Sequence, residues 1–390
     1  MVIEREKFID YFHQNKCLYY SITPGPIYSW ATPVRIENEQ TGETHKIRIL
    51  LAHDESTFKS GEIQSSRWVF PENAPLFSKG RGRGLMLSYF IVLHDNETFF
   101  ELNDEEWRVA VKEYPQLLNP ESKLTYYERS ASGWLETGKD NYVDNEVILE
   151  QFERLFILLK FKKCFSRAAI EIIVDNARTH SAKQYDLMLI NKFDSAKRCT
   201  YETIEWMDSE NQSHVINCSY KDDDSDLLMS KGLFAIAKEL NLIDKNTETR
   251  DKRYTLPKLR ELLYYHPAFS NRSKLEVLGL KYDVKIIFCP KFHCECNPIE
   301  GFWCYLKQYV RKRNDQNFNT MKNLIIEAIE SYKKIGLNMK LWKRFWKVVR
   351  SYKDGDSYQH ILQSYFGAKS SSKVQYHKNN EHFNTLIDRE

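Results

Sequence analysis

Residues 284–313 read VKIIFCPKFHCECNPIEGFWCYLKQYVRKR, an apolar run followed by a loop and a long amphipathic stretch. The run at 284–288 is apolar enough to predict a buried strand. Asn297, Pro298 and Glu300 then form a helix-start signature, in which an N-cap residue and a proline precede a glutamate at the capping-box position. We therefore predict a strand, a loop and a helix, with a carboxylate in the first turn of the helix.

Two earlier apolar runs also lead to an acidic residue. KIRILLAHDE, at 46–55, leads to Asp54, and AIEIIVDNARTH, at 169–180, contains a strand-like run that leads to Asp175. Hydrophobic patterning predicts a further strand at 85–94 and an amphipathic helix at 144–162. This alternation of strands and helices predicts an α/β fold with a mixed sheet and helices packed on its faces.

The domain organisation follows from length and composition. The chain has 390 residues, of which 42% are hydrophobic, so it can bury a sizeable core. Residues 181–280 are long, polar and partly acidic, and they interrupt the alternation of strands and helices. We predict an N-terminal segment at 1–45 and a sheet domain in two parts, at 46–180 and 281–315. Between these two parts we predict an insertion subdomain at 181–280, and after them a helical basic C-terminal region at 316–390.

Membrane and disulfide signals are absent from the sequence. It has no run of eighteen or more apolar residues, and its first residues lack the apolar core of a signal peptide, so we predict no membrane association. The eight cysteines are spread along the chain, which favours free thiols over a disulfide framework. CPKFHCEC, at 289–296, offers cysteine and histidine ligands, but its spacing fits no usual zinc pattern.

Basic residues are concentrated late in the chain, although the net charge is only +3. Between Tyr305 and Lys353 there are thirteen Lys and Arg against three Asp and Glu. One basic group follows Glu300 along its predicted helix: Lys307, Arg311, Lys312 and Arg313. A later helix has the apolar residues Leu337, Leu341, Phe345, Val348 and Tyr352 opposite the basic residues Lys340, Lys343, Arg344, Lys347 and Arg350. Such faces either bind nucleic acid or are simply solvated, and the sequence leaves both readings open.

Asp54, Asp175 and Glu300 share a topological position, because each lies just beyond a predicted strand. Ligand sites in open α/β sheets lie outside the carboxyl ends of the strands. Three carboxylates brought together there would repel one another unless cations neutralised them, and such oxygen ligands suit Mg²⁺ or Mn²⁺. Two-metal phosphoryl transfer uses a cluster of this kind. Each acid taken alone is also compatible with a turn or a helix cap.

Three motifs carry a family resemblance. AHDEST at 52–57, IIVDNARTH at 172–180 and IIFCPKFHCECNPIEGFWCYLKQYVRKR at 286–313 together resemble the catalytic domain of mariner-like DDE transposases, in particular the fungal type with a PKFHCE-N-IE-FW motif. The resemblance implies a ribonuclease-H-like fold. It also implies a metal-dependent nuclear enzyme that cuts double-stranded DNA at transposon ends and joins the 3′ ends to target DNA.

The resemblance also implies roles for individual residues. Asp54, Asp175 and Glu300 would be the catalytic triad and would hold two Mg²⁺ or Mn²⁺ ions. Water bound at the metals would attack a phosphodiester, and the released 3′-hydroxyl would attack a second strand. Further residues match motif positions and would orient the ligands, the helix or the substrate: Glu55, Asn176, His180, His293 and Asn297. A homodimer is compatible with this reading, and VRKRN at 310–314 is compatible with nuclear import.

Three departures from the family pattern keep alternative readings open, although all three acidic motif positions are filled. Tyr89 stands in SYF at 88–90, where relatives of this type are expected to have an aspartate. The interval from Asp175 to Glu300 is much longer than in mariner elements. Residues 1–45 are too few for the paired helix-turn-helix modules that read transposon ends, which predicts a truncated chain or one without that specificity. The alternatives are a decayed or domesticated transposase that binds DNA or protein without cleaving, and a cellular nuclease of similar fold.

Overall fold

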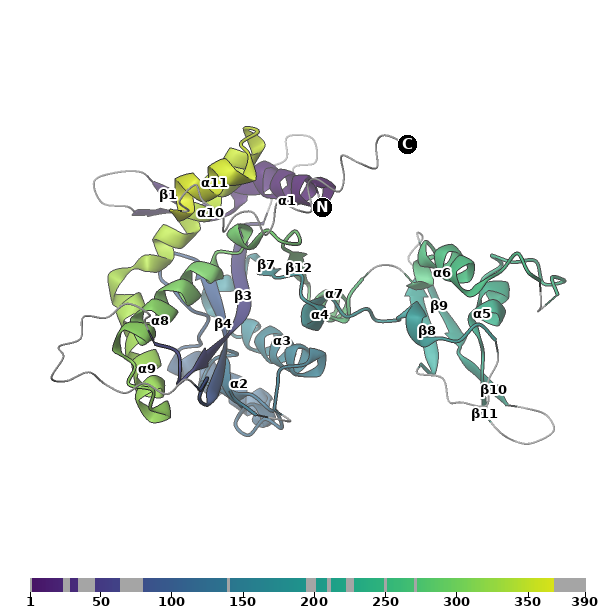
Figure 1. Cartoon of the computed structure of the whole chain (residues 1–390), viewed down its shortest axis with the longest axis horizontal. Helices are drawn as coiled ribbons and strands as arrows, with labels where there is room; N and C mark the ends of the chain where they lie inside the picture. The colour runs from purple at the N-terminus through teal and green to yellow at the C-terminus, as the bar shows by residue number, and fades with distance from the viewer. Residues whose placement is uncertain are drawn as a thin grey trace. The chain divides into compact units, whose positions relative to one another are not determined.

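The predicted strands are neighbours in one six-stranded mixed sheet, shown in Figure 1, with the order β12-β7-β3-β4-β6-β5. Strand β3 pairs antiparallel with β4 and parallel with β7, and β12 pairs parallel with β7. The strands span Arg48–Lys59 (β3), Gly84–Leu93 (β4), Thr125–Tyr126 (β5), Gly133–Thr137 (β6), Ala169–Val174 (β7) and Val284–Phe288 (β12). The predicted mixed α/β sheet flanked by helices is therefore confirmed.

This computed structural model describes residues 2–23, 29–33, 46–63, 80–138, 141–193, 201–208, 212–221, 228–248, 251–269 and 272–367. The chain divides into two units, one formed by 1–180 with 278–390 and the other by 181–277. The VRKRN stretch lies in the first unit. No helix among these residues is both long and apolar enough to cross a membrane.

Helices cover both faces of the sheet because the side chains of β3 alternate between them. Leu50, Ala52 and Phe58 share a core with helices α1, α8, α9 and α10. On the other face, His53 contacts Phe152 of α3. The helices of this unit span Val2–Asn15 (α1), Asp104–Glu113 (α2), Asn145–Leu159 (α3), Arg178–Ser181 (α4), Ile299–Arg313 (α8), Phe318–Ile335 (α9), Leu337–Lys353 (α10) and Tyr358–Phe366 (α11).

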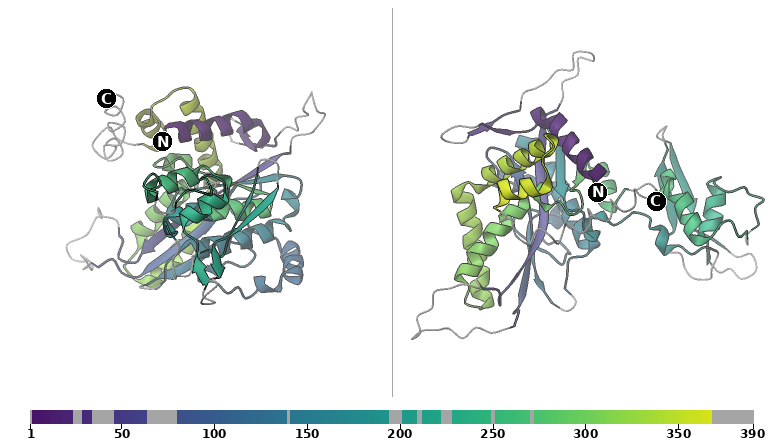
Figure 2. Two further views of the ribbon diagram at one scale, coloured as in Figure 1. Left: turned by 90° about the vertical axis from the view of Figure 1, so that its right-hand side faces the viewer. Right: turned by 45° about the horizontal axis from the view of Figure 1, so that its top comes forward.

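Both ends of the chain belong to the sheet unit. In α1, Tyr11 donates a hydrogen bond to the buried Glu171 of β7 at 2.5 Å, and Glu171 also pairs with Arg48 of β3 at 2.8 Å. Strands β1 (Ser21–Thr23) and β2 (Ser29–Ala31) follow α1 as a small hairpin. Figures 1 and 2 show α1 beside the C-terminal helices, where Phe12 contacts Phe345 of α10. The N-terminal segment and the C-terminal helices thus complete the core around the sheet.

The C-terminal helix α10 is less cleanly divided into apolar and basic faces than its sequence predicts. Trp342 is fully buried, and its Nε1 donates a hydrogen bond to the carbonyl of Val92 at 3.0 Å. Arg344, predicted on the basic face, is half-buried with its guanidinium 4.4 Å from the ring centroid of Phe366. The prediction fails for Arg344 because α11 packs over that part of α10.

The second unit has its own small core. Its elements span Thr203–Met207 (β8), Ser213–Asn217 (β9), Ser219–Lys221 (β10), Leu228–Ser230 (β11), Leu233–Glu239 (α5) and Leu256–Tyr264 (α6), and α7 (Lys274–Lys281) leads back to the sheet. Buried residues of this unit include Ile204, Ile236, Leu259 and Leu263. The ends of the unit are held together, because Lys183 forms a bridge with Ser273 and the Lys274 N–H donates to the Ala182 carbonyl at 2.8 Å.

Candidate active site

The sequence pattern predicts Asp54 at the end of its strand, and this prediction is wrong, because Asp54 lies inside strand β3. The strand continues to Lys59 because it remains paired with β4 over its whole length after Asp54. Its pairing with β7 ends at Ala52 and Ile173. The register therefore places Asp54 just beyond the end of β7, level with Asp175, which directly follows that strand.

Helix α8 supplies a hydrogen bond to the buried Asp54 carboxylate. The indole Nε1 of Trp303 donates to Asp54 Oδ2 at 3.0 Å. Burial raises the pKa of Asp54 well above its usual value, and the charges of Glu55, Glu300 and Asp175 raise it further. The three acids that the sequence predicts as a triad are therefore within electrostatic range of one another.

Glu300 occupies the first turn of α8, as predicted, but the predicted capping box is not formed. The N-cap is Pro298, which has no side-chain capping bond, and the Glu300 N–H bonds the Asn297 carbonyl at 3.2 Å. The Asn297 side chain instead donates to the carbonyl of His53 on β3 at 3.4 Å. The capping-box prediction fails because the Asn297 side chain forms its hydrogen bond with strand β3 and not with the start of α8.

The carboxylate of Glu300 has no hydrogen-bond or ion-pair partner among the residues that the structure describes. Burial raises the pKa of Glu300, Lys307 opposes that shift, and Asp175 adds to it. Glu300 and Trp303 are one turn apart on α8, and Lys307 follows one turn later on the same stripe of the helix. This stripe faces Asp54 and brings one cation toward the acids.

His180 joins two of the acids near the end of β7. Its Nδ1 lies 2.5 Å from Asp175 Oδ1 and its Nε2 lies 3.2 Å from Glu55 Oε1. Burial lowers the pKa of His180, but the charge of Glu55 and the bonds to both acids outweigh it and raise the pKa to about 10. Asn145 of α3 holds the turn before His180 by donating to the Thr179 carbonyl at 2.6 Å. The raised pKa therefore makes the buried His180 an imidazolium at neutral pH.

The same interaction sets the charge of Glu55. Burial acts to raise the pKa of Glu55, but the charge and hydrogen bond of His180 outweigh it and lower that pKa to about 2. Glu55 and His53 extend from the face of β3 opposite Asp54, because side chains alternate along a strand. Acidic groups thus lie on both faces of β3, and Asp175 lies at the strand end between them.

A hydrogen-bond chain fixes the tautomer of His53. The Gln151 amide donates to the Ala131 carbonyl at 2.9 Å, so its Oε1 can accept from the Ser88 hydroxyl at 2.9 Å. Ser88 Oγ must then accept from His53 Nε2, at 2.8 Å. Burial lowers the pKa of His53 to about 4, so the ring is neutral and its Nδ1 keeps a lone pair.

The buried group of His53, Glu55 and His180 could hold a metal ion. One ligand atom from each lies within 4.8 Å of the other two, and no other trio of His, Cys, Asp or Glu in the described part of the chain is grouped in this way. His53 Nδ1 and Asn297 Oδ1 are buried and have no hydrogen-bond partner among the described residues, whereas the buried atoms of Glu55, Asp175 and His180 are already ion-paired with one another. The lone pair of His53 Nδ1 is therefore available to an ion.

The predicted DNA-binding residues differ in their surroundings. Lys307 acts electrostatically on Glu300, whose pKa it acts to lower, and its Nζ lies 5.9 Å from the ring centroid of Phe58. Arg311 forms an ion pair with Glu62 at 2.7 Å. Lys312 and Arg313 are exposed at the end of α8, and Arg313 lies 3.8 Å from the ring centroid of Tyr309. Lys312 and Arg313 are therefore the most accessible members of the group.

His293 belongs to a different cluster from the acids. Its Nδ1 lies 2.6 Å from Glu295 Oε1, and the hydroxyl of Tyr352 donates to the same oxygen at 2.6 Å. This cluster ties the loop before α8 to α10, and His293 thus supports the loop that leads to Glu300.

Asn176 follows Asp175 directly and is half-buried.

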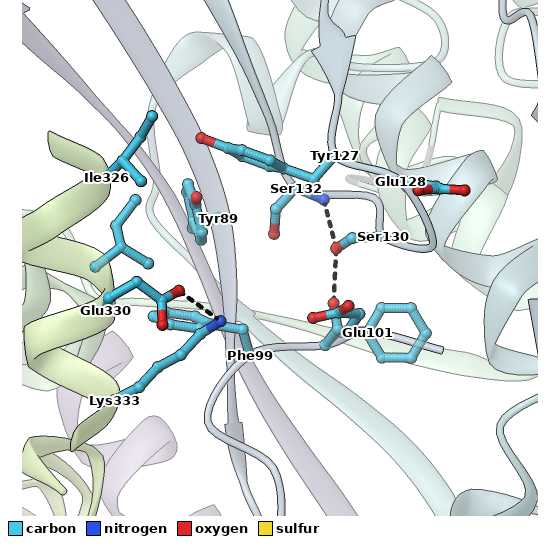
Figure 3. A pocket seen from close by; sticks show the side chains of 12 residues that line it. Tyr89, Phe99, Glu101, Tyr127, Glu128, Ser130, Ser132, Ile326, Glu330 and Lys333 are labelled. Atoms are coloured by element: carbon cyan, nitrogen blue, oxygen red, sulfur yellow. Dashed lines mark hydrogen bonds and ion pairs between the residues drawn. The ribbon is translucent and has the colours of Figure 1, made fainter. Parts of the chain in front are cut away.

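Tyr89, at the position where an aspartate is expected, belongs to an aromatic wall. It is buried on β4, with its ring centroid 5.5 Å from Phe302 and 6.1 Å from Trp303. Figure 3 shows Tyr89 and Tyr127 facing Ile326 and Lys333 of α9 across a cavity of about 360 Å³. Tyr89 therefore lines a cavity of mixed aromatic and polar character, and none of the three predicted acids lines that cavity.

Three residues that contact the candidate site, Trp303, Ser88 and Gln151, are not predicted from the sequence. Trp303 could have been found from the FW pair that follows Glu300 by one turn. Ser88 and Gln151 carry no local signal, because they meet His53 only after β4 and α3 pack against β3.

Comparison with protein-family models gives no match, and no curated protein matches this chain either.

Proposed function

We propose that this chain is the catalytic unit of a DDE-type DNA transposase, which cleaves DNA and transfers the 3′ ends by metal-dependent phosphoryl transfer. The observation that carries the proposal is the convergence of Asp54, Asp175 and Glu300 from β3, the end of β7 and the start of α8. The mixed sheet with helices on both faces is compatible with the ribonuclease-H-like fold that the motifs imply.

The residues present fit divalent cations. The neighbouring acids raise the pKa of Asp54, and the Glu300 carboxylate has no protein partner among the described residues. A bound cation would lower the pKa of Asp54 and would give the Glu300 carboxylate a partner. We propose that Asp54, Asp175 and Glu300 hold two Mg²⁺ or Mn²⁺ ions. When bound, the ions would supply activation of the attacking oxygen and stabilisation of the leaving oxygen.

The surrounding side chains would prepare this site. Trp303 holds one oxygen of Asp54, which fixes the orientation of that carboxylate. His180 holds Asp175 from the other face of the sheet and keeps Glu55 ionised. Asn297 anchors the start of α8 to β3, and therefore fixes the position of Glu300 relative to Asp54.

Double-stranded DNA is the proposed substrate. Lys307, near the acids, and the exposed Lys312 and Arg313 would contact its phosphates, whereas Arg311 must first leave Glu62. Under this proposal the protein acts in the nucleus on transposon ends and target DNA. A homodimer would allow two DNA ends to be processed together.

Plasmid nicking tests the proposal. The purified protein with Mg²⁺ or Mn²⁺ should convert supercoiled plasmid to the nicked form, and Asp175→Asn should lower the rate at least about a hundredfold. Asp283→Asn is a matched control, because Asp283 is exposed and has a positive φ of 55° that asparagine also tolerates. Equal nicking by wild type and Asp175→Asn would rule out the acid site as its source.

A second candidate function is DNA binding without cleavage, and Tyr89 favours it. A buried tyrosine takes the place of an expected aspartate directly beside Asp54. This candidate predicts salt-sensitive binding of DNA through the basic residues of α8, and no nicking with either metal. Binding with an unchanged plasmid would therefore support this second function over the first.

A further inference from the structure

A second cavity, of about 590 Å³, is lined in part by the edge strand β5. Its wall brings together Trp107 of α2, Tyr126 of β5 and Arg154 of α3. Polar groups of Asn119 and Ser122 also line it. Strand β5 is at the opposite edge of the sheet from β12, and the lining includes none of the acids or histidines of the candidate active site, although Tyr127 and Glu128 line both cavities.

Arg154 is a buried cation that has no carboxylate partner in the part of the chain that the structure describes. Its residue surface is 7% exposed, its Nε donates to the Ser130 carbonyl at 2.8 Å, and its Nη1 donates to the Leu117 carbonyl at 3.0 Å. A guanidinium has five N–H donors, so these bonds leave most of them for other partners. No acid among the described residues forms an ion pair with Arg154, and the cavity residue Glu128 is exposed.

This arrangement gives the Arg154 cation no opposite charge among the described residues. Burial lowers the pKa of Arg154, and only the nearby Tyr126 opposes that shift. A buried charge is normally paired, because removal from water costs more than two neutral carbonyls return. The cavity is therefore electrostatically prepared for an anionic group.

The aromatic side chains of the cavity favour a ligand that has a planar ring. The guanidinium carbon of Arg154 lies 4.6 Å from the ring centroid of Tyr126 and 5.8 Å from that of Trp107. Both rings line the same cavity as the cation, and such rings stack on planar bases. A ligand that joins an oxyanion to a planar ring would satisfy both features.

We propose that this cavity binds a nucleotide, with its phosphate on Arg154 and its base against Trp107 or Tyr126. The planar fork of arginine matches phosphate geometry, and the cavity volume falls within the range of small-molecule sites. A free mononucleotide and one nucleotide of a DNA strand present the same chemistry. The site needs no metal, so it is independent of the proposed cleavage reaction.

Calorimetry of the full chain in EDTA tests this site. Deoxyadenosine monophosphate should bind at least about tenfold more tightly than deoxyadenosine, which lacks the phosphate. Arg154→Met should weaken nucleotide binding by a similar factor. Arg108→Met is the matched control, because Arg108 is an exposed arginine of α2 outside the cavity and its loss should change nothing.

A second variant tests the site without removing Arg154, so that a folding defect in Arg154→Met cannot explain the result. Asn119→Asp is isosteric, places a negative charge in the cavity wall and leaves the carbonyl bonds of Arg154 intact, so it should also weaken nucleotide binding about tenfold. Competition by a short deoxyadenylate strand would identify DNA as the source, and its absence would identify a free nucleotide. Failure of the nucleotide to bind, or equal affinity in wild type and Asn119→Asp, would overturn the proposal whatever the nicking result.

Discussion

Asp54 and Tyr89 lie directly opposite each other on the antiparallel strands β3 and β4, so their side chains share one face of the sheet. Trp303 contacts both residues, through a hydrogen bond to Asp54 and a ring contact with Tyr89. An aspartate at position 89 would therefore bring a further carboxylate next to the acids. The tyrosine brings an apolar ring in its place.

Tyr89→Asp should be strongly destabilising without metal. The change removes a buried ring and adds a buried carboxylate next to Asp54, which should cost roughly 3–5 kcal/mol of unfolding free energy. Added Mg²⁺ should restore part of that loss if cations bind beside Asp54. Urea denaturation with and without Mg²⁺ measures both effects, and Tyr89→Phe, which keeps the ring, should lose only about 1 kcal/mol. Full stability of Tyr89→Asp in EDTA would contradict this account.

Trp303→Phe should weaken metal binding through Asp54. The variant keeps an aromatic ring but removes the N–H that holds Asp54 Oδ2, so the pKa of Asp54 should rise further and Mg²⁺ affinity at neutral pH should fall about tenfold. Trp342→Phe is a matched control, since Trp342 is also buried but donates to the neutral Val92 carbonyl. Both variants should lose about 2 kcal/mol of stability, whereas only Trp303→Phe should affect calorimetric Mg²⁺ binding.

The His180 ion pairs should make stability depend on pH. The pKa of His180 is raised from 6.5 to about 10 in the fold, so its contribution is complete below pH 6.5 and is lost as the pH rises through about 10. In EDTA, the unfolding free energy of wild type should therefore fall by a few kcal/mol across this interval. His180→Gln should show a flatter profile. Parallel profiles for the two proteins in urea titrations would exclude a buried imidazolium.

Two metal-ligand groups should be separable by the type of metal. Two imidazoles and one carboxylate suit Zn²⁺ or Co²⁺, whereas three carboxylates suit Mg²⁺. His180→Gln should therefore lower Zn²⁺ affinity at least about tenfold and Mg²⁺ affinity by a smaller factor, because it removes a Zn²⁺ ligand but only the partner that orients Asp175 for Mg²⁺. Glu300→Gln should lower Mg²⁺ affinity and leave Zn²⁺ binding largely intact. Zn²⁺ binding should also release the His180 proton, which calorimetry in buffers of different ionisation enthalpy detects. Equal effects of both substitutions on both metals would indicate a single shared site.

Local patterning predicted the positions of the acids well. Apolar runs are strong signals for buried strands, and the ends of parallel strands meet at one edge of a sheet, so Asp175 and Glu300 lie where the pattern indicates. Asp54 lies further inside its strand because strand length depends on β4, a partner that local patterning does not reveal.

The supporting contacts could not be predicted in the same way. His53 meets Ser88 and Gln151 only through strand register and helix packing. Asn297 carries a strong capping signal, yet its side chain bonds β3, because a tertiary hydrogen bond replaces the local one. Sequence patterns thus placed the acids beside the sheet strands, whereas the orientation of their side chains depends on contacts between distant segments.

The bridge between Lys183 and Ser273 has a consequence for how the chain folds. Strands β7 and β12 are adjacent and parallel, although more than a hundred residues separate them. If the 181–277 unit forms first, its closed ends leave a loop of roughly twenty residues to be joined, which lowers the entropic cost of pairing the strands by about 1.5 kcal/mol. The inserted unit can then act as a folding clamp that brings the last strand of the sheet into register at little kinetic penalty.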